Sequence, residues 1–335
     1  MSKFLNLLNH ALLLCALVCL PAYAAKAKPA YFASNPAVLE FIQEMAAKHG
    51  FNEEELIRQF VRIHPDPKVI QFIKPPASPL QRSWQRYQSR FLNELRIEGG
   101  VRFWQEHRAA LARASRQYGV PEEIIVAIIG VETLYGRNTG TFSVLQALAT
   151  LAFHYPPRAE FFRSELEQFL LLARENGFDP LEIKGSFAGA LGIPQFMPGS
   201  QRRFAVDFDG DGHIDLSSSA EDAIGSVARF LEQHGWKTGE PIAVPARIEG
   251  APDRALIEAG IRPSLDAGTL AKQGIRSEAP ANATTALIDL VSPGFDTEYW
   301  LGFENFYVIT RYNRSSFYAM AVFQLSQEIS GRMEY

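Results

Sequence analysis

One acidic side chain stands at the end of a long apolar stretch in this chain of 335 residues. Every residue from Ile124 to Val131 is apolar or glycine, and Glu132 follows as the only charged residue between Glu123 and Arg137. A helix that is apolar all round is buried. Desolvation raises the pKa of a carboxyl group held there, as a general acid requires. The alternative is a structural glutamate that pairs with a buried arginine or caps backbone groups.

A second group of oxygen donors lies further along the chain, where residues 207–215 read DFDGDGHID. Asp207, Asp209 and Asp211 alternate with other residues, and Gly212 follows them. This is the opening of an EF-hand calcium loop, with glycine at the sharp turn. Because every side-chain ligand is a hard oxygen donor, the pattern predicts calcium.

The second half of this acidic loop departs from the standard pattern. His213 at the seventh position would ligate through its backbone carbonyl, but the twelfth position holds Ser218 instead of a bidentate glutamate. Glu221 and Asp222 are the next acids, so the loop has to be longer than usual. We select Asp222 as the last ligand because it begins the helical pattern DAIGSVARF. The alternative is a solvated Asp-Gly turn without metal.

Composition excludes several classes of protein. Hydrophobic residues make up 47% and charged residues 21%, which excludes a disordered chain and a protein with many membrane spans. The 33 basic and 37 acidic residues leave a net charge of −4, so electrostatics give no reason to expect nucleic-acid binding. No HExxH, CxxC, GxSxG or phosphate-binding glycine-rich motif occurs. These absences disfavour a zinc enzyme and a serine hydrolase.

The N-terminus has the pattern of an export signal. Lys3 precedes an unbroken apolar run over residues 11–20, and Ala22-Tyr23-Ala24 matches a signal-peptidase site. The alternatives are an anchor helix and a lipoprotein, but the residues before Cys15 and Cys19 are large where lipid attachment needs a small one. We expect cleavage after Ala24. The mature chain then contains no cysteine and folds without disulfides.

The elements that position the acidic groups are predicted to be mainly helical. Asn35-Pro36 begins the first helical pattern as a cap followed by proline. The proline-rich segment 74–79 reads as a linker. Helical patterns cover residues 35–72, 80–118, 120–134, 144–153, 158–176, 220–234 and 316–329.

The segment after Trp236 has a different texture. Residues 239–306 contain many prolines and glycines and short β-branched runs. Residues 300–302 and 306–312 flank the polar pair Glu304-Asn305, which predicts a β-hairpin. The expected fold class is therefore mainly α (α+β), a helical protein that carries a small β-rich insertion.

These motifs together resemble the family-B membrane-bound lytic murein transglycosylases, glycoside hydrolase family 103. The resemblance covers most of the chain from about Ala37 onward. It rests on GVETLYG at 130–136, GSFAGALGIPQFMPGS at 185–200, DFDGDGHIDL at 207–216, DAIGSVARFLEQHGW at 222–236 and RYNRSSFYAMAV at 311–322.

The resemblance implies a lysozyme-like helical core with an additional helical domain, a small β-rich domain and a calcium loop. The implied division is a signal peptide (1–24), a flexible segment (25–35), a helical domain (36–115), the lysozyme-like core with the EF-hand-like loop (116–238), the β-rich domain (239–306) and a segment that returns to the core (307–335). It further implies that Glu132 is the single catalytic acid. The implied sugar-cleft residues are Ser186, Gln195, Tyr312, Asn313 and Tyr318, together with Tyr87, Arg158 and Phe230, which lie in weaker local motifs.

The resemblance also implies an activity, the cleavage of the MurNAc–GlcNAc β-1,4 bond of peptidoglycan with formation of 1,6-anhydro-MurNAc. Most glycosidases use two carboxylates, whereas this family chemistry uses one glutamate as acid and then as base. The alternatives are a hydrolytic muramidase and a non-catalytic peptidoglycan-binding protein. The implied partners are peptidoglycan glycan strands, with cell-wall synthesis enzymes as candidate protein partners. We expect a monomer in a bacterial periplasm, without a lipid anchor.

Overall fold

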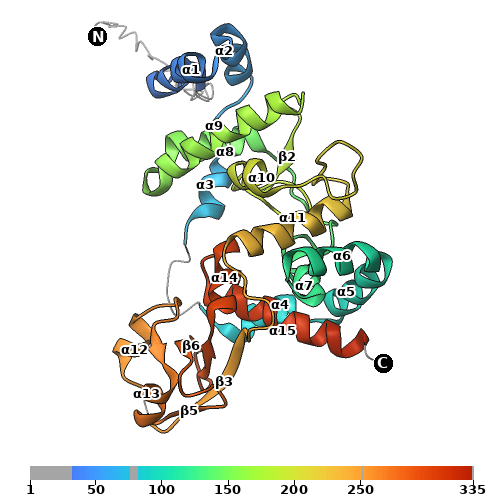
Figure 1. Ribbon diagram of the computed structural model, residues 1–335. Helices are drawn as coiled ribbons and strands as arrows, with labels where there is room; N and C mark the ends of the chain where they lie inside the picture. The colour runs from blue at the N-terminus through green and yellow to red at the C-terminus, as the bar shows by residue number, and fades with distance from the viewer. Residues whose placement is uncertain (1–31, 76–81, 251, 334–335) are drawn as a thin grey trace, which may run out of the picture.

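The computed structural model describes residues 32–75, 82–250 and 252–333, and this part of the chain is mainly helical with two small antiparallel sheets (Figure 1). The fold class predicted from the sequence is confirmed. The helices are α1 (Pro36–His49), α2 (Glu53–Val61), α3 (Pro67–Ile73), α4 (Trp84–Phe91), α5 (Glu94–Glu106), α6 (Arg108–Tyr118), α7 (Glu122–Thr133), α8 (Val144–His154), α9 (Ala159–Glu175), α10 (Pro198–Phe204), α11 (Ala220–Gln233), α12 (Arg254–Glu258), α13 (Ala267–Lys272), α14 (Glu304–Tyr312) and α15 (Ser316–Met333). The strands are β1 (Phe142–Ser143), β2 (Lys184–Gly185), β3 (Ala243–Ile248), β4 (Leu265–Asp266), β5 (Ile275–Ser277), β6 (Thr284–Leu290) and β7 (Glu298–Gly302), and the short 3-10 helices are η1 (Phe32–Ser34) and η3 (Pro156–Arg158).

An N-terminal apolar cluster joins helices from two distant parts of the chain. The buried Phe41 of α1 belongs to the same cluster as Leu148 of α8 and Phe169 of α9. Asn35 caps α1 by accepting a hydrogen bond from a backbone N–H, and Pro36 fills the first turn, as the sequence predicted. Figure 1 shows α1 and α2 at one end of the molecule, with α8 and α9 beside them.

A central apolar cluster surrounds α7, which packs against α5, α6, α11 and α15. Residues 124–131 of α7 are all buried, because an all-apolar helix gains most when neighbours cover every face. Helices α4 to α6 also belong to this cluster, whereas α1 to α3 belong to the N-terminal one. The segment predicted as a single helical domain, residues 36–115, is thus shared between two cores.

The larger sheet has the strand order β4-β6-β7-β3-β5, and all its pairs are antiparallel. It lies at the end of the molecule opposite α1 and α2, with α12 and α13 beside it (Figure 1). Leu287 and Leu301 pair across β6 and β7 and are buried in a third apolar cluster with Ile275. The smaller sheet pairs β1 with β2, two residues each, and it precedes the loop that contains Ser186.

The predicted hairpin around Glu304-Asn305 is wrong, because residues 304–312 form helix α14. Only the first half, residues 300–302, belongs to a strand, β7. Asn305 is buried, and its side chain bonds to the backbone of Lys237 and Glu240, which fixes the first turn of the helix in place. The β-branched pair Val308-Ile309 favours a strand locally, but burial against the central cluster outweighs that preference.

The predicted signal peptide lies outside the described residues. Within the described ranges, no helix combines the length and the apolar character needed to cross a membrane.

Candidate active site

Glu132 lies in the last turn of α7, where the helix ends abruptly. Leu134 has a φ of 52°, Tyr135 of 61° and Gly136 of 80°, so three successive residues adopt left-handed backbone conformations. Such a turn terminates a helix because the chain can no longer form the i to i−4 bonds. Glu132 is partly buried at this point, which agrees with the position that the apolar run predicted for it.

Tyr135 holds the end of α7 by its side chain. Its hydroxyl donates to the carbonyl oxygen of Arg96 at 2.7 Å. The ring fits against Gly99, Gly100 and Gly130, and a Cβ atom at any of these glycines would press on it. The glycines therefore create the slot that accepts the ring, and the ring fixes the backbone just after Glu132.

Among the residues that the structure describes, the carboxyl group of Glu132 has one close polar partner. The hydroxyl of Tyr318, on α15, donates to its Oε1 at 2.6 Å. Burial raises the pKa of Glu132 to about 7, and the hydrogen bond from Tyr318 opposes part of that rise. A carboxyl group with this pKa carries a proton on a large fraction of molecules near neutral pH, which suits a general acid.

Three tyrosines surround Glu132. The ring of Tyr312 stacks on that of Tyr318, with centroids 6.3 Å apart and planes inclined by 13°. Burial, and next the negative charge of Glu132, raise the pKa of Tyr312 well above its usual value and that of Tyr87 to about 12. Burial, and next the negative charge of Glu132, also raise the pKa of Tyr318 well above its usual value. The structure thus brings together the predicted residues Glu132, Tyr87, Tyr312 and Tyr318.

A cavity of about 750 Å³ opens beside this cluster. Tyr312 belongs to both, because it lines the cavity and stacks on the tyrosine that holds Glu132. Glu132 itself does not line the cavity, and Tyr312 connects the cavity to Tyr318, the hydrogen-bond partner of Glu132. Four further predicted residues, Gln195, Asn313, Arg158 and Phe230, line the cavity.

These four residues are held at the cavity by different contacts. Gln195 has a φ of 52°, and its amide donates to the carbonyl oxygens of Thr139 and Gly192. Phe230 is buried and packs edge-on against Tyr312. Arg158 lies over the ring of Phe161, and Asn313 is exposed where α14 ends.

Ser186 has a loop-forming role in the structure. Its hydroxyl accepts hydrogen bonds from the backbone N–H of Ala190 at 2.9 Å and of Ala188 at 3.3 Å. Ala188 lines the cavity, whereas Ser186 does not. The serine shapes the wall of the cavity from behind.

Sequence reasoning passed over three residues that the structure places at this site. Arg311 and Arg314 line the cavity. They flank Tyr312 and Asn313 in the segment RYNR, of which only these two central residues were expected to be cleft residues. Thr133 is buried directly after Glu132 and bonds to a loop 60 residues away. The two arginines lie beside residues that were selected, but no local pattern reveals the partner of Thr133.

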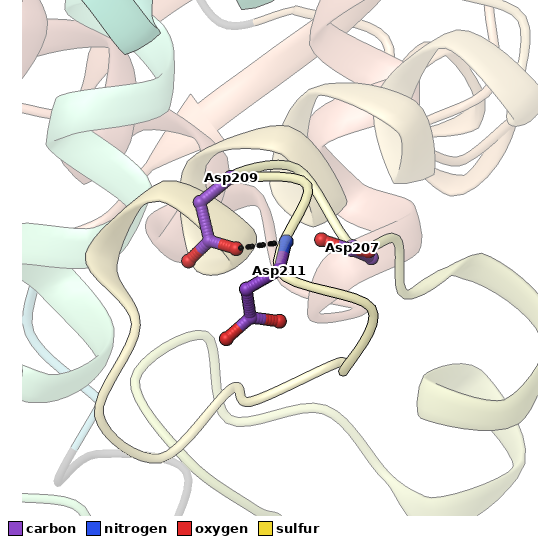
Figure 2. Close-up of side chains that lie close together, drawn as sticks. All are labelled: Asp207, Asp209 and Asp211. Atoms are coloured by element: carbon purple, nitrogen blue, oxygen red, sulfur yellow. Dashed lines mark hydrogen bonds between the residues drawn. The ribbon is translucent and has the colours of Figure 1, made fainter.

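The acidic loop forms a compact turn in which Asp207, Asp209 and Asp211 are exposed (Figure 2). Each offers a carboxylate oxygen, and these oxygens lie within 4.8 Å of one another. Asp207 accepts the backbone N–H of Gly210 and Gly212, which wraps the loop around its carboxylate. Three hard oxygen donors at this spacing can hold a divalent cation.

Asp222 is buried and lies under the acidic loop. Its Oδ1 accepts the N–H of Phe208 at 2.7 Å, and its Oδ2 accepts the N–H of Asp215 at 2.7 Å. Glu221 instead pairs with Arg113 at 3.2 Å on the exposed side. The selection of Asp222 over Glu221 as the last metal ligand stays a prediction, since the carboxylate cluster consists of the first three aspartates. His213 is exposed beside them, and its N–H bonds to Asp211.

Comparisons with known proteins identify the family of this chain. The family model "Transglycosylase SLT domain" matches residues 33–327. The chain is 44% identical over 311 residues to membrane-bound lytic murein transglycosylase B of Escherichia coli (strain K12), across 89% of this chain and 84% of that protein.

Two solved structures have the same fold over most of their length. The soluble lytic transglycosylase SltB1 from Pseudomonas aeruginosa is 48% identical with a TM-score of 0.82, and the match covers 90% of this chain and 100% of that one. The Escherichia coli lytic transglycosylase Slt35, solved in complex with calcium, is 43% identical with a TM-score of 0.81, over 91% and 96% of the two chains. The resemblance found in the motifs is therefore confirmed. This chain belongs to the family of membrane-bound lytic murein transglycosylase B and is a lytic transglycosylase that acts on peptidoglycan.

Proposed function

We propose that Glu132 alone supplies the acid and the base that cleave the MurNAc–GlcNAc bond and form 1,6-anhydro-MurNAc. The observation that carries the proposal is a single carboxyl group with a pKa of about 7, held by Tyr318 next to a cavity large enough for sugar rings. A group that titrates near neutral pH can both give and take a proton in one reaction cycle.

Another carboxyl group, that of Glu165, does line the cavity, but a backbone hydrogen bond holds it. Glu165 accepts the backbone N–H of Gly199 at 2.8 Å at the start of α10. The pKa of Glu132 depends on burial and on Tyr318, whereas that of Glu165 depends on burial, Gly199 and Arg203. A two-carboxylate mechanism needs a pair of carboxyl groups that flank one bond. Glu165 lines the cavity as the hydrogen-bond partner of Gly199, whereas Glu132 does not line it.

The proposed reaction conserves every atom of the substrate. Protonated Glu132 gives its proton to the glycosidic oxygen, and the bond from that oxygen to C1 of MurNAc breaks. The N-acetyl oxygen of the substrate stabilises the positive charge that develops at C1. The carboxylate of Glu132 then takes the proton of the C6 hydroxyl group, and O6 bonds to C1. Because Tyr318 occupies Oε1, the other oxygen of Glu132 is free to carry the proton.

We further propose that the acidic loop binds a structural calcium ion. Asp207, Asp209 and Asp211 supply the clustered oxygens. The loop pattern adds the carbonyl of His213 and the carboxylate of Asp222 as the remaining ligands of the proposal. Calcium supplies positive charge that offsets the repulsion among the aspartates. The support is the oxygen cluster in this chain and the calcium complex of Slt35, its relative of 43% identity.

The export pattern of residues 1–24 supports a periplasmic location for the mature enzyme. The relatives include both a protein called membrane-bound and one called soluble, so the family alone does not select between an anchored and a free form. The large residues before both cysteines support the free form.

Mass spectrometry of purified sacculi after digestion tests the proposed chemistry. We expect fragments that end in 1,6-anhydro-MurNAc from the wild type and none from Glu132→Gln. Reducing ends in place of anhydro ends would identify a hydrolytic muramidase. Tight binding to sacculi without any fragments would identify a binding protein.

A further inference from the structure

Thr133, the residue after the catalytic acid, joins two segments of the active site through one hydroxyl group. Its side chain is 1% exposed. The hydroxyl lies 2.8 Å from the carbonyl oxygen of Ile193, to which it donates, and it accepts the backbone N–H of Gly136 at 2.9 Å. The carbonyl oxygen of Ile129, one turn back in α7, is more distant at 3.4 Å.

Both segments that this hydroxyl joins have unusual backbone conformations. In the described part of the chain, the non-glycine residues with positive φ are Leu134, Tyr135 and Gln195. The first two form the turn after Glu132, and Gln195 lies in the loop that contains Ile193. Left-handed conformations cost free energy in residues that have a Cβ atom, and they persist only where surrounding contacts enforce them.

We propose that Thr133 is a positioning residue that sets the place of Glu132 relative to the loop presenting Gln195. The inference rests on the proposed function of Glu132. Thr133 touches neither the cavity nor the carboxyl group, so it acts only through its neighbours on each side.

No other group can replace the Thr133 hydroxyl in its two hydrogen bonds. Among the described residues, the carbonyl oxygen of Ile193 and the N–H of Gly136 have no other hydrogen-bond partner. The N–H of Ile193 donates to the carbonyl oxygen of Leu216 at 2.7 Å, which ties the same residue to the acidic loop. Removal of the hydroxyl therefore leaves two polar groups without a protein partner, the buried carbonyl oxygen of Ile193 and the half-buried N–H of Gly136, and frees the turn to move.

Thr133→Val tests this role because valine keeps the shape of threonine and removes only the hydroxyl. Thr133→Ser keeps the hydroxyl and should retain wild-type activity within about twofold. For the valine variant, we expect kcat to fall roughly 10- to 100-fold with little change in KM, because small displacements of a catalytic group are costly. Looser packing also hydrates Glu132, so the alkaline limb of the kcat profile should move to lower pH.

Thr150→Val is the matched control. Thr150 is also fully buried in a helix, donates to a backbone carbonyl oxygen at 2.7 Å and accepts the N–H of Asp66 at 3.1 Å. It lies in α8 within the N-terminal apolar cluster. We expect Thr150→Val to lower the melting temperature as Thr133→Val does, with kcat and the pH profile unchanged.

The outcomes separate positioning from stability. Hydrogen exchange of the Gly136 amide should be faster in Thr133→Val than in Thr133→Ser, and this readout needs no activity. Wild-type kcat in Thr133→Val, or an equal loss in both valine variants, would overturn the proposal. If Thr133→Val does not fold, a large loss of kcat in folded Thr133→Ser overturns it as well. An inactive wild type would instead refute the function of Glu132 and leave the exchange result to judge Thr133.

Discussion

Replacement of Glu132 by glutamine should abolish turnover and at the same time stabilise the folded enzyme at neutral and alkaline pH. Glutamine cannot deliver the proton, and proton transfer alone is worth roughly 10²- to 10⁴-fold in rate. It can still accept the hydrogen bond from Tyr318. The gain in stability arises because the native protein keeps a carboxyl group in a place that disfavours its charge.

The size of that gain follows from the pKa of Glu132. The pKa is about 7 in the native state against a usual value of 4.5. Below pH 4.5 both states bind the proton, so the native state pays no penalty. Between pH 4.5 and 7 the unfolded chain releases its proton while the native protein holds it, so stability falls as the pH rises. Above pH 7 the full loss of about 3 kcal/mol is present.

Urea unfolding of both proteins at pH 4 and pH 8 measures this effect. We expect Glu132→Gln to exceed the wild type in free energy of unfolding by about 3 kcal/mol at pH 8 and by little at pH 4. Glu182→Gln, which removes an exposed carboxylate, serves as the control for the loss of one charge. An equal or lower stability of Glu132→Gln at pH 8 would refute the claim that burial raises the pKa of this group.

Four further outcomes are expected. Tyr318→Phe removes the hydrogen bond that favours charged Glu132, so the alkaline limb of the kcat/KM profile should shift upward by about one pH unit, and an unchanged limb would contradict this role. A calcium chelator should lower the melting temperature of the wild type. The loss in free energy of unfolding is about 2.7 kcal/mol where the free calcium concentration was a hundred times the Kd. Asp211→Ala should melt alike with and without chelator, and identical wild-type melts would reduce the loop to an acidic turn. N-terminal sequencing of enzyme released by osmotic shock should begin at Ala25, and recovery only with detergent would contradict a free periplasmic form.

Local patterns in the sequence were sufficient for the parts of the site that depend on local structure. The buried helix α7 follows from an unbroken apolar run, and the turn of the acidic loop follows from alternating aspartates and a glycine. The same kind of reasoning failed for α14, whose β-branched residues favour a strand until burial of Asn305 and its neighbours decides the outcome.

Contacts between distant residues could not be derived in this way. Tyr318 lies 186 residues from Glu132, and only the resemblance to a family selected it. Thr133 and Ile193 are 60 residues apart, and nothing in either segment indicates the other. The resemblance also grouped Ser186 with the cleft residues, and no local pattern indicated that its hydroxyl also accepts hydrogen bonds from the backbone of its own loop.

The walls of the cavity come from two hydrophobic cores. Phe162 belongs to the N-terminal apolar cluster, and Phe196 and Phe230 belong to the central one. If the glycan strand binds in this cavity, as the proposed function implies, it contacts both cores, and neither core can unfold without also losing the bound strand. Its binding free energy is then added to the stability of both. The enzyme should resist proteases best while it is engaged with the wall, and release of the strand returns it to its more vulnerable state.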